Sequence, residues 1–154
     1  MTDDSTIVRY RRQIDAPAEV VFGLLSTAAG MTEWLAVDAE IDLRVGGQIR
    51  WTHANGARVA GRILAVEPPT RLVFTYGWIG SEDVAPGRTE VAIELLAEPG
   101  GARTELTLVH RELPTDRRDD HRAGWVHFLG ELASVSGRLA GDQRASDEAG
   151  RSAT

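Results

Sequence analysis

Cysteine is absent from this chain of 154 residues, and so is lysine, since all 17 basic residues are arginine. Without cysteine the chain has no disulfide bond, no thiolate nucleophile and no zinc or iron–sulfur site that needs thiolate ligands. No run of about 18 apolar residues occurs, so the sequence predicts no membrane-spanning helix. A chain of this length forms one domain and buries roughly 70% of its unfolded surface without such supports.

The charge pattern argues against nucleic acid as a partner. The net charge is −6, and the arginines alternate with acidic residues, as in 116–120. No basic stripe forms, which is what nucleic-acid binding requires. Arginine without lysine could serve phosphate recognition, but GC-rich coding DNA accounts for it better. The start of the chain, residues 1–5, is acidic and polar, unlike a secretory signal, so we expect a cytoplasmic protein.

The first part of the chain predicts one strand and two short helices. Residues 5–14 alternate with period two, which is typical of a strand with one solvent-facing side, and Arg12 falls on the same face as Val8 and Ile14. Pro17 fits the first turn of a helix, where its missing N–H costs nothing. A second short helix is expected over about 28–35.

Residues 38–111 predict about six further strands. Turns are expected at Gly46–Gly47, at 67–70, where consecutive prolines end a strand, and at 99–101. Residues 77–87 form a long loop rich in Gly, Pro and acidic residues, which is a candidate for a mobile lid or an ordinary connection.

A long helix is expected over about 116–140. Its apolar face is predicted to comprise Trp125, Phe128, Leu129, Leu132, Val135 and Leu139. Three glycines, at 124, 130 and 137, each cost about 1 kcal/mol relative to alanine, and we interpret them as allowing close approach to the sheet. Residues 1–140 therefore form one domain, and 141–154, rich in Gly, Ser, Ala and charge, are predicted to be a disordered tail.

These elements predict an α+β fold. A sheet with one apolar face needs a cover, and the long helix has a matching apolar face. A curved antiparallel sheet wrapped around this C-terminal helix would leave a space between them, and we expect a pocket there.

Several segments resemble a known superfamily. Residues 14–22 (IDAPAEVVF) resemble the opening of START-like (SRPBCC) helix-grip proteins. Later segments resemble its branch of Hsp90-ATPase-activator-homologue-like proteins: Trp34-Leu35, 42–47 (DLRVGG), 61–68, 71–75 (RLVFT), 104–110 and 121–125 (HRAGW). The resemblance covers about residues 7–140, and the order and number of the segments carry it.

The resemblance implies a helix-grip fold with an interior cavity, but no single activity. Members of the superfamily bind hydrophobic small molecules, and some relatives catalyse cyclisation or hydroxylation. The eukaryotic co-chaperones carry a separate N-terminal domain that does much of the activation, and nothing like it occurs in this sequence. Fold by itself is therefore a weak argument for function.

The sequence contains no built-in catalytic motif. A phosphate-binding loop, a nucleophile elbow and a dinucleotide-binding glycine pattern are all missing. His121 and His127 are six residues apart, which is not the spacing of a zinc-binding helix. We therefore predict no catalytic residue, no metal and no cofactor.

Two histidines and one arginine are expected to point inward. His53 and His110 lie on inward strand faces, where they could anchor a ligand, act as acid and base, or be core histidines with satisfied hydrogen bonds. An inward Arg12 needs a carboxylate or an anion, and Glu112 is a candidate partner. A register shift of one residue would instead turn Arg12 to solvent.

The aromatic residues on the inward faces are either core or pocket wall, and tryptophan and tyrosine add polar groups to such a wall. Trp34 could lie at the pocket mouth. The predicted cavity lining is Trp34, Trp51, His53, Ile63, Phe74, Tyr76, Trp78, Val91, Ile93, Leu106, Leu108, His110, His121, Trp125, Phe128, Leu129 and Leu132.

Three functions are compatible with the sequence. The first is binding of a mostly apolar small molecule in the cavity. The second is a co-chaperone-like or stress-response interaction module, which predicts an exposed apolar patch and a protein partner. The third is a cyclase- or hydrolase-like enzyme for a hydrophobic substrate, which predicts a titratable pair with perturbed pKa values. No nucleic acid or membrane partner is expected, and the protein is a monomer or a homodimer.

Overall fold

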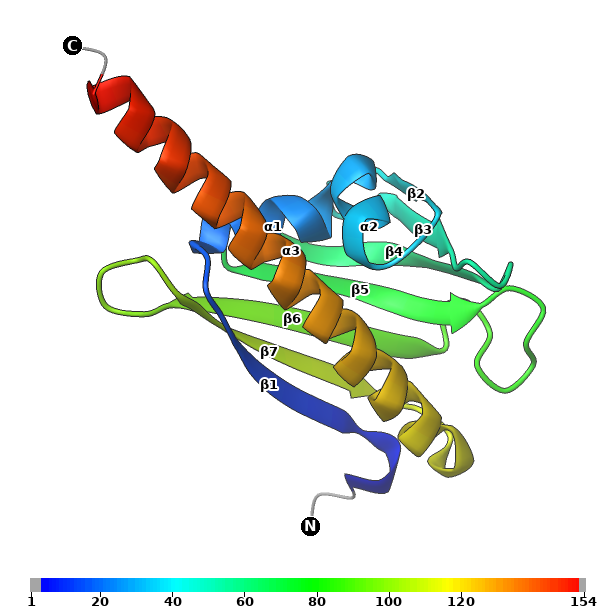
Figure 1. Ribbon diagram of the computed structural model, residues 1–154. Coiled ribbons are helices and arrows are strands. Elements are labelled where there is room, and N and C mark those ends of the chain that lie inside the picture. The colour runs from blue at the N-terminus through cyan, green and yellow to red at the C-terminus, as the bar shows by residue number, and fades with distance from the viewer. Residues whose placement is uncertain (1–3, 153–154) are drawn as a thin grey trace.

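The computed structural model describes residues 4–152 (Figure 1). One strand, two short helices, six more strands and a long helix follow one another along the chain, which confirms the predicted order. The elements are η1 (Asp4–Thr6), β1 (Val8–Ile14), α1 (Ala18–Ser26), α2 (Ala28–Trp34), β2 (Asp38–Ile41), β3 (Gln48–Thr52), β4 (Arg58–Glu67), β5 (Arg71–Trp78), β6 (Thr89–Ala97), β7 (Thr104–Arg111), η2 (Thr115–Arg117) and α3 (Arg118–Ser152).

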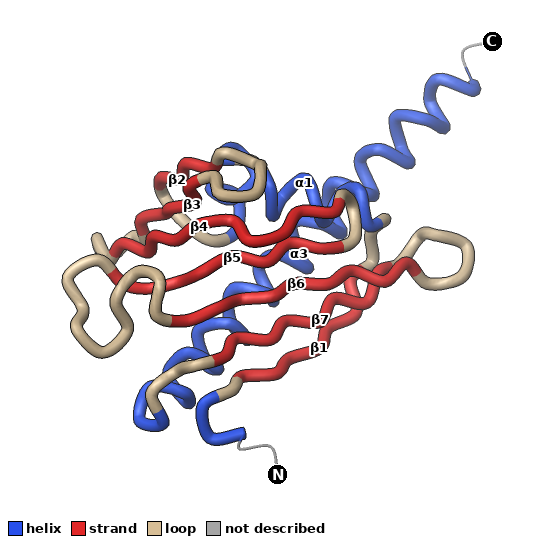
Figure 2. The backbone as a smooth tube through the Cα atoms, turned by 180° about the vertical axis from the view of Figure 1, so that it is seen from behind, coloured by secondary structure: helices blue, strands red, loops and turns tan. Residues whose placement is uncertain are grey.

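The strands form one antiparallel sheet of seven in the order β1-β7-β6-β5-β4-β3-β2. All three α-helices lie on the same face of this sheet, and α3 crosses it diagonally (Figure 1). Seen from behind, none of the three α-helices of the described chain covers the opposite face (Figure 2). The predicted α+β helix-grip architecture, a sheet around a long C-terminal helix, is therefore confirmed.

The alternation of apolar side chains determines which face of each strand meets the helices. In β6 and β7, buried and partly exposed residues alternate, so that Val91, Ile93, Leu106, Leu108 and His110 all turn inward. Alternate side chains of a strand lie on the same face, and that face was the one predicted. In β4 a bulge between Ile63 and Ala65 shifts the register of pairing with β5. The alternation of inward and outward side chains in β4 is therefore interrupted after Ile63.

α3 buries the first part of its predicted apolar face. Trp125, Leu129, Leu132 and Val135 are buried, whereas Leu139 is 40% exposed, so the prediction was wrong for that residue. The helix also runs on to Ser152, beyond the end expected near residue 140, and this part extends past the sheet (Figure 1). Once a helix has formed, each further residue adds one backbone hydrogen bond, so the helix can extend past the sheet. The domain boundary at 140 stays a prediction, and 153–154 lie outside the described residues.

The glycines of α3 do not serve close packing. A Cβ atom added at Gly124 or Gly137 would have no neighbouring atom within 4 Å, and one at Gly130 would meet only a terminal nitrogen of Arg12 at 4.0 Å. The interpretation that these glycines allow the helix to approach the sheet was therefore wrong. Gly124 instead borders the open space described below.

Arginines of α3 hold the edge strand β1. Arg118 Nε donates to the carbonyl of Ile7 at 2.7 Å, and Arg122 Nη1 donates to the carbonyl of Arg9 at 2.9 Å. The two arginines are one helical turn apart and the two carbonyls are two residues apart, so the spacings match. These bonds occupy backbone groups that an edge strand would otherwise leave unpaired.

Arg12 faces inward beneath α3 as predicted, but its predicted partner was wrong. Its Nη1 donates to the Tyr10 hydroxyl at 3.4 Å, and its buried Nε has no hydrogen-bond partner. Glu112, the residue expected to pair with it, is exposed and has a φ of 67°. Glu112 follows the end of β7 at a sharp bend, and this turn directs its side chain toward solvent.

The short helices are fixed to each other by side-chain bonds. Thr27 caps α2 by accepting from the backbone N–H of Gly30 at 3.0 Å, and the Trp34 indole donates to the carbonyl of Leu24 at 2.8 Å. Trp34 is thereby held between α1 and α2. Within the described part of the chain, no helix has the length and apolar character needed to cross a membrane.

Candidate functional site

A cavity of about 690 Å³ opens between the sheet, the C-terminal end of α2 and the first half of α3. Its walls come from segments far apart in the sequence. They are the end of α2 and the connection after it (Thr32, Glu33, Trp34, Leu35, Ala36, Val37), β3 and the following turn (Trp51, His53, Ala54, Asn55), β5 (Tyr76, Trp78), and η2 with α3 (Arg117, Asp120, His121, Gly124, Trp125, His127, Phe128, Glu131).

Aromatic rings make up most of the inner wall. All four tryptophans of the chain line the cavity. Tyr76 lies at the centre of the cluster, with its ring centroid 5.8 Å from that of Trp51, 6.0 Å from Trp78 and 6.2 Å from Trp125. Most of these pairs are tilted or edge-on, which is the favoured geometry for aromatic side chains. The cavity is therefore wide, apolar and held by rings that pack on one another.

Three of the tryptophans each donate their indole N–H to a histidine. The first pair lies within one segment, where Trp51 Nε1 donates to Nε2 of His53 at 3.0 Å. Because Nε2 accepts, the proton of the neutral imidazole is on Nδ1. The backbone of Leu35, at the end of α2, partly opposes the effect of burial on the pKa of His53.

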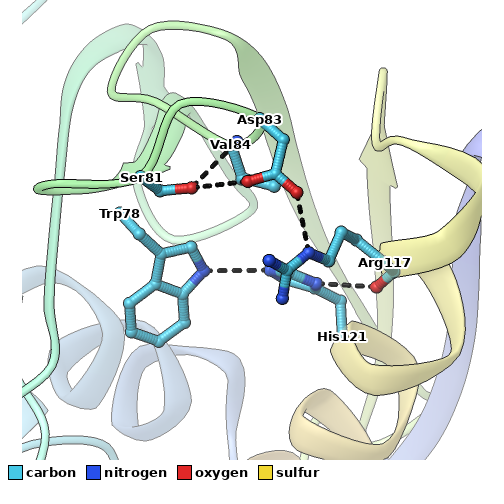
Figure 3. Close-up of polar contacts among 6 residues, drawn as sticks. All are labelled: Trp78, Ser81, Asp83, Val84, Arg117 and His121. Carbon is cyan, nitrogen blue, oxygen red and sulfur yellow. Dashed lines mark hydrogen bonds and ion pairs between the residues drawn. The ribbon is translucent and has the colours of Figure 1, made fainter.

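The second pair joins β5 to the start of α3 (Figure 3). Trp78 Nε1 donates to Nε2 of His121 at 3.0 Å, and Nδ1 of His121 is 2.8 Å from the carbonyl of Arg117. Since a carbonyl only accepts, Nδ1 carries the proton and Nε2 is the acceptor. Arg117 lies four residues before His121, one helical turn away. The hydrogen bond to its carbonyl therefore fixes the orientation of the His121 ring independently of the contact with the sheet.

The third pair lies behind the wall of the cavity, since Trp125 lines the cavity and His110 does not. The Thr89 hydroxyl donates to the carbonyl of Tyr76 at 2.7 Å and is 2.8 Å from Nε2 of His110. Its only proton is thus used, so Nε2–H of His110 must donate to the hydroxyl oxygen. Nδ1 of His110 then accepts the indole N–H of Trp125 at 3.0 Å.

These contacts keep the histidines neutral. Burial lowers the pKa of His53 and of His121, and burial together with the nearby His121 lowers the pKa of His110 to about 3. A protonated imidazole has no acceptor, so it could not receive the indole N–H. The indole N–H groups of the wall therefore all have acceptors only while the three imidazole rings are neutral.

The hydroxyl of Tyr76 is the exception among the inner polar groups. The side chain is 4% exposed and lines the cavity. The single indole proton of Trp78 is donated to His121, and burial raises the pKa of the Tyr76 phenol far above its usual range. Among the described residues no acceptor is placed for the hydroxyl proton, so this donor is available to a ligand.

Charged side chains are confined to the rim. Glu33, Asp120 and Glu131 contribute carboxylates, and Arg117 contributes the one arginine of the lining. The guanidinium of Arg117 is occupied, because its Nε lies 2.8 Å from Oδ2 of Asp83 (Figure 3). This pairing lowers the pKa of Asp83 and leaves the rim with an excess of negative charge.

The loop between β5 and β6 (79–88), predicted over 77–87 as a mobile lid or an ordinary connection, is tied down at several points. The backbone N–H of Trp78 donates to the backbone carbonyl of Val84 at 2.6 Å, and the Val84 side chain is buried. Ser81 accepts from the Val84 N–H and donates to Asp83, which in turn pairs with Arg117 (Figure 3). The loop thus connects β5 to the start of α3 beside the cavity.

The predicted lining residues fall into three groups. Eight line the cavity: Trp34, Trp51, His53, Tyr76, Trp78, His121, Trp125 and Phe128. Phe74 and Ile93 border a void of about 10 Å³ next to it. Seven others pack outside both spaces, namely Ile63, Val91, Leu106, Leu108, His110, Leu129 and Leu132. Trp34 is a buried part of the wall rather than an exposed residue at the mouth.

Sequence reasoning missed the rim. Glu33, His127 and Glu131 read as ordinary residues on solvated helix faces, 54–55 as an ordinary turn, and Gly124 as a point of close approach to the sheet. Only the three-dimensional crossing of α3 over the sheet brings them together. Within the described residues, no group of three or more His, Asp or Glu side chains is arranged to hold a metal ion.

Comparison with known proteins identifies a family. The sequence model of the family described as activator of Hsp90 ATPase homolog 1-like protein matches residues 15–137. No protein with a curated description matches the chain.

Solved structures with the same fold come from several bacteria. Protein MLL2253 from Mesorhizobium loti is 25% identical over 86% of this chain and 97% of its own, with a TM-score of 0.74. CalU16 from Micromonospora echinospora is 27% identical over 85% of this chain and 74% of its own, with a TM-score of 0.68. The Aha1 dimer from Colwellia psychrerythraea is 22% identical over 85% of this chain and 96% of its own, with a TM-score of 0.72, and shows likeness of fold alone.

Proposed function

The chain belongs to the family of activator of Hsp90 ATPase homolog 1-like proteins, and from this membership and its cavity we propose that it binds a hydrophobic small molecule between the sheet and α3. One observation carries the proposal: a cavity of about 690 Å³ is walled by all four tryptophans of the chain. Small-molecule sites in proteins have volumes of about 300–1,000 Å³ and mostly apolar walls.

The polar groups of the wall support a ligand that is mainly apolar. The indole N–H groups of Trp51, Trp78 and Trp125 are already bonded to histidines. A ligand therefore does not have to satisfy them, and a polar ligand surface facing them would lose its own hydrogen bonds to water. The Tyr76 hydroxyl is the inner group left to orient the bound molecule.

Binding can be detected without a label, because every tryptophan lines the site. We expect a fused-ring aromatic, polyketide-like or lipid compound to shift the tryptophan emission and to raise the melting temperature. Native mass spectrometry should show the same compound bound in a one-to-one complex. A library of such compounds that changes neither the emission nor the melting temperature would contradict the proposal.

A pair of glycine substitutions locates the binding. In Gly124→Leu the new side chain begins at a helix position that borders the cavity and has no atom within 4 Å. It should fill part of the space and weaken binding by about tenfold or more, a change of about 1.4 kcal/mol. Gly137→Leu is the matched control, since it adds the same side chain to the same helix at a position with equal room outside the cavity. Equal affinity in both variants would place the ligand elsewhere.

An enzyme is less well supported by the geometry. A general base must have a free acceptor, yet His53, His110 and His121 each accept an indole N–H, and the pKa of each is lowered. Lowering the pKa of an imidazole makes it a weaker base. The co-chaperone-like module remains the alternative outcome: no compound binds, and a stable protein complex is isolated in its place.

A further inference from the structure

The cavity combines an aromatic wall, one unused hydroxyl donor and an acidic rim. We propose that it selects a cationic aromatic ligand, with ring atoms among the tryptophans, a hydrogen-bond acceptor at the Tyr76 hydroxyl and a protonated amine at the rim. This inference rests on the proposed function and specifies the chemical class of the ligand.

The rim carries more negative than positive charge. Three carboxylates line it, from Glu33, Asp120 and Glu131, against the single guanidinium of Arg117. Arg117 is paired with Asp83, which lies on the loop outside the lining, so its charge is compensated before any ligand arrives. An entering cation therefore meets uncompensated carboxylates, whereas an anion meets repulsion.

The position of Glu33 is unfavourable for the helix that carries it. It precedes Trp34, the last residue of α2, and the C-terminal end of a helix has partial negative charge. A carboxylate there is repelled by the helix, and a bound cation would relieve that repulsion. Asp120 differs, because it lies in the first turn of α3, where the helix end offsets part of its charge. Glu33 and Glu131 should therefore contribute more to cation selection than Asp120.

The wall inside the rim favours the same ligand class. The faces of tryptophan and tyrosine rings attract cations, and no charged side chain opposes this deep in the cavity while the histidines are neutral. His127 also lines the cavity near the rim.

The Tyr76 hydroxyl adds a requirement that is independent of charge. Its side chain is buried among Trp51, Trp78 and Trp125, and its proton has no acceptor among the described residues. The hydroxyl oxygen is not one of the fully buried polar atoms that lack a partner, so it reaches the cavity, where a carbonyl or ether oxygen of the ligand can accept its proton. The preferred ligand therefore carries an acceptor on its ring system and a positive charge at its other end.

Four probes separate these requirements. Three are anthraquinones that carry an aminomethyl, a hydroxymethyl or a carboxylate group, and the fourth is an anthracene with the aminomethyl group and no carbonyl. Affinities are measured by quenching of tryptophan emission near pH 7.5, at low and at high salt. At low salt we expect the ammonium anthraquinone to bind about tenfold more tightly than the carboxylate one, with the neutral one between them, and high salt should shrink the difference.

Variants test each side chain separately. Glu33→Gln combined with Glu131→Gln should remove most of the preference for the ammonium probe without weakening the neutral probe, and Glu19→Gln, on α1 outside the lining, should change neither. Tyr76→Phe should weaken the ammonium anthraquinone about fivefold and leave the anthracene within about twofold, because only the anthraquinone has an acceptor. Urea unfolding of each variant confirms that it is folded.

The outcomes separate this inference from the proposed function. If the neutral probe binds but the carboxylate probe binds as tightly as the ammonium probe, or the double glutamine variant keeps the full preference, the ligand class is wrong while the binding function stands. If Tyr76→Phe weakens both ammonium probes equally, the hydroxyl does not recognise an acceptor. If none of the four probes binds, the proposed function fails together with the ligand class.

Discussion

The indole N–H of Trp125 donates to Nδ1 of His110 across 3.0 Å, and this bond joins α3 to β7, the strand next to the edge strand β1. His110 is completely buried, and its Nε2 is hydrogen-bonded to Thr89, so neither nitrogen of the imidazole is free to bind another group. Trp51 with His53 and Trp78 with His121 repeat the same arrangement nearer the opening. Hydrogen bonds between neutral rings therefore support the wall of the cavity.

His110→Ala should destabilise the protein. The substitution leaves the indole of Trp125 without an acceptor and the Thr89 hydroxyl without its donor, and it opens a hole in the core. We expect the free energy of unfolding to fall by about 2–4 kcal/mol in urea titrations. His127→Ala, on the exposed side of α3, should change it by no more than about 0.5 kcal/mol. A His110→Ala protein of normal stability would show that the two bonds contribute little.

The stability of the protein should decrease as the pH falls below about 6.5. Above that value the imidazole of His110 is neutral in both the folded and the unfolded chain, so it adds no pH dependence. Below it the unfolded chain binds a proton that the folded chain does not, because burial lowers the folded pKa to about 3. The free energy of unfolding should fall by about 1.4 kcal/mol per pH unit from this group until the pH nears 3.

Urea titrations between about pH 6.5 and about pH 5 measure this slope before most carboxylates titrate. The expected loss from His110 is about 2 kcal/mol, and the lowered pKa values of His53 and His121 add to it in the same direction. His110→Gln, which keeps a donor and an acceptor but cannot titrate, should have a shallower slope. The same slope in both proteins would mean that His110 binds its proton equally in the folded and unfolded chains.

Periodicity predicted those parts of the structure that one element determines by itself. The alternation in β5 to β7 identified the inward faces, and the apolar positions of α3 were correct as far as Val135. The prediction for Leu139 was wrong because the apolar spacing continues beyond the point where α3 leaves the sheet. The pair Trp51 and His53 was within reach of sequence reasoning, since side chains two apart on a strand share a face.

The cavity itself depends on tertiary placement. Trp78 and His121 are 43 residues apart, and nothing in the local pattern indicates that they meet. The acidic rim was missed for a related reason: Glu33 and Glu131 resemble solvated helix residues until α2 and α3 are placed side by side. Family resemblance gave the fold and the expectation of a cavity, but not the partners of the individual side chains.

Gly77→Ala should disrupt the loop beside the cavity. A Cβ atom at this position would lie 2.0 Å from the carbonyl oxygen of Ala85, and a backbone atom can move away only if the loop shifts. The shift would break the bond between Trp78 and Val84 and expose the buried Val84 side chain. We expect a loss of about 2 kcal/mol or more in thermal or urea unfolding, with faster amide exchange over 79–88.

Gly23→Ala is the control for that substitution. Gly23 lies inside α1, and an added Cβ meets no atom within 4 Å, so alanine should stabilise the protein by about 0.5–1 kcal/mol. If Gly77→Ala is as stable as Gly23→Ala, the loop can accommodate the added Cβ atom without losing stability, and the prediction is wrong.

Arg12→Met should leave the protein as stable as before, or stabilise it by about 1 kcal/mol. The buried Nε of Arg12 has no partner, and its contact with the Tyr10 hydroxyl is long at 3.4 Å. Methionine retains an unbranched apolar stem against α3 and removes the polar group that lost its water on folding. Arg11→Met is the control on the solvent-facing side of the same strand, where an exposed pair with Glu105 contributes little. The contradictory result is a free energy of unfolding, from urea titration, that falls by more than about 1 kcal/mol in Arg12→Met but not in Arg11→Met. The guanidinium of Arg12 would then stabilise the contact between β1 and α3, and a negative charge near it would have to balance its positive charge.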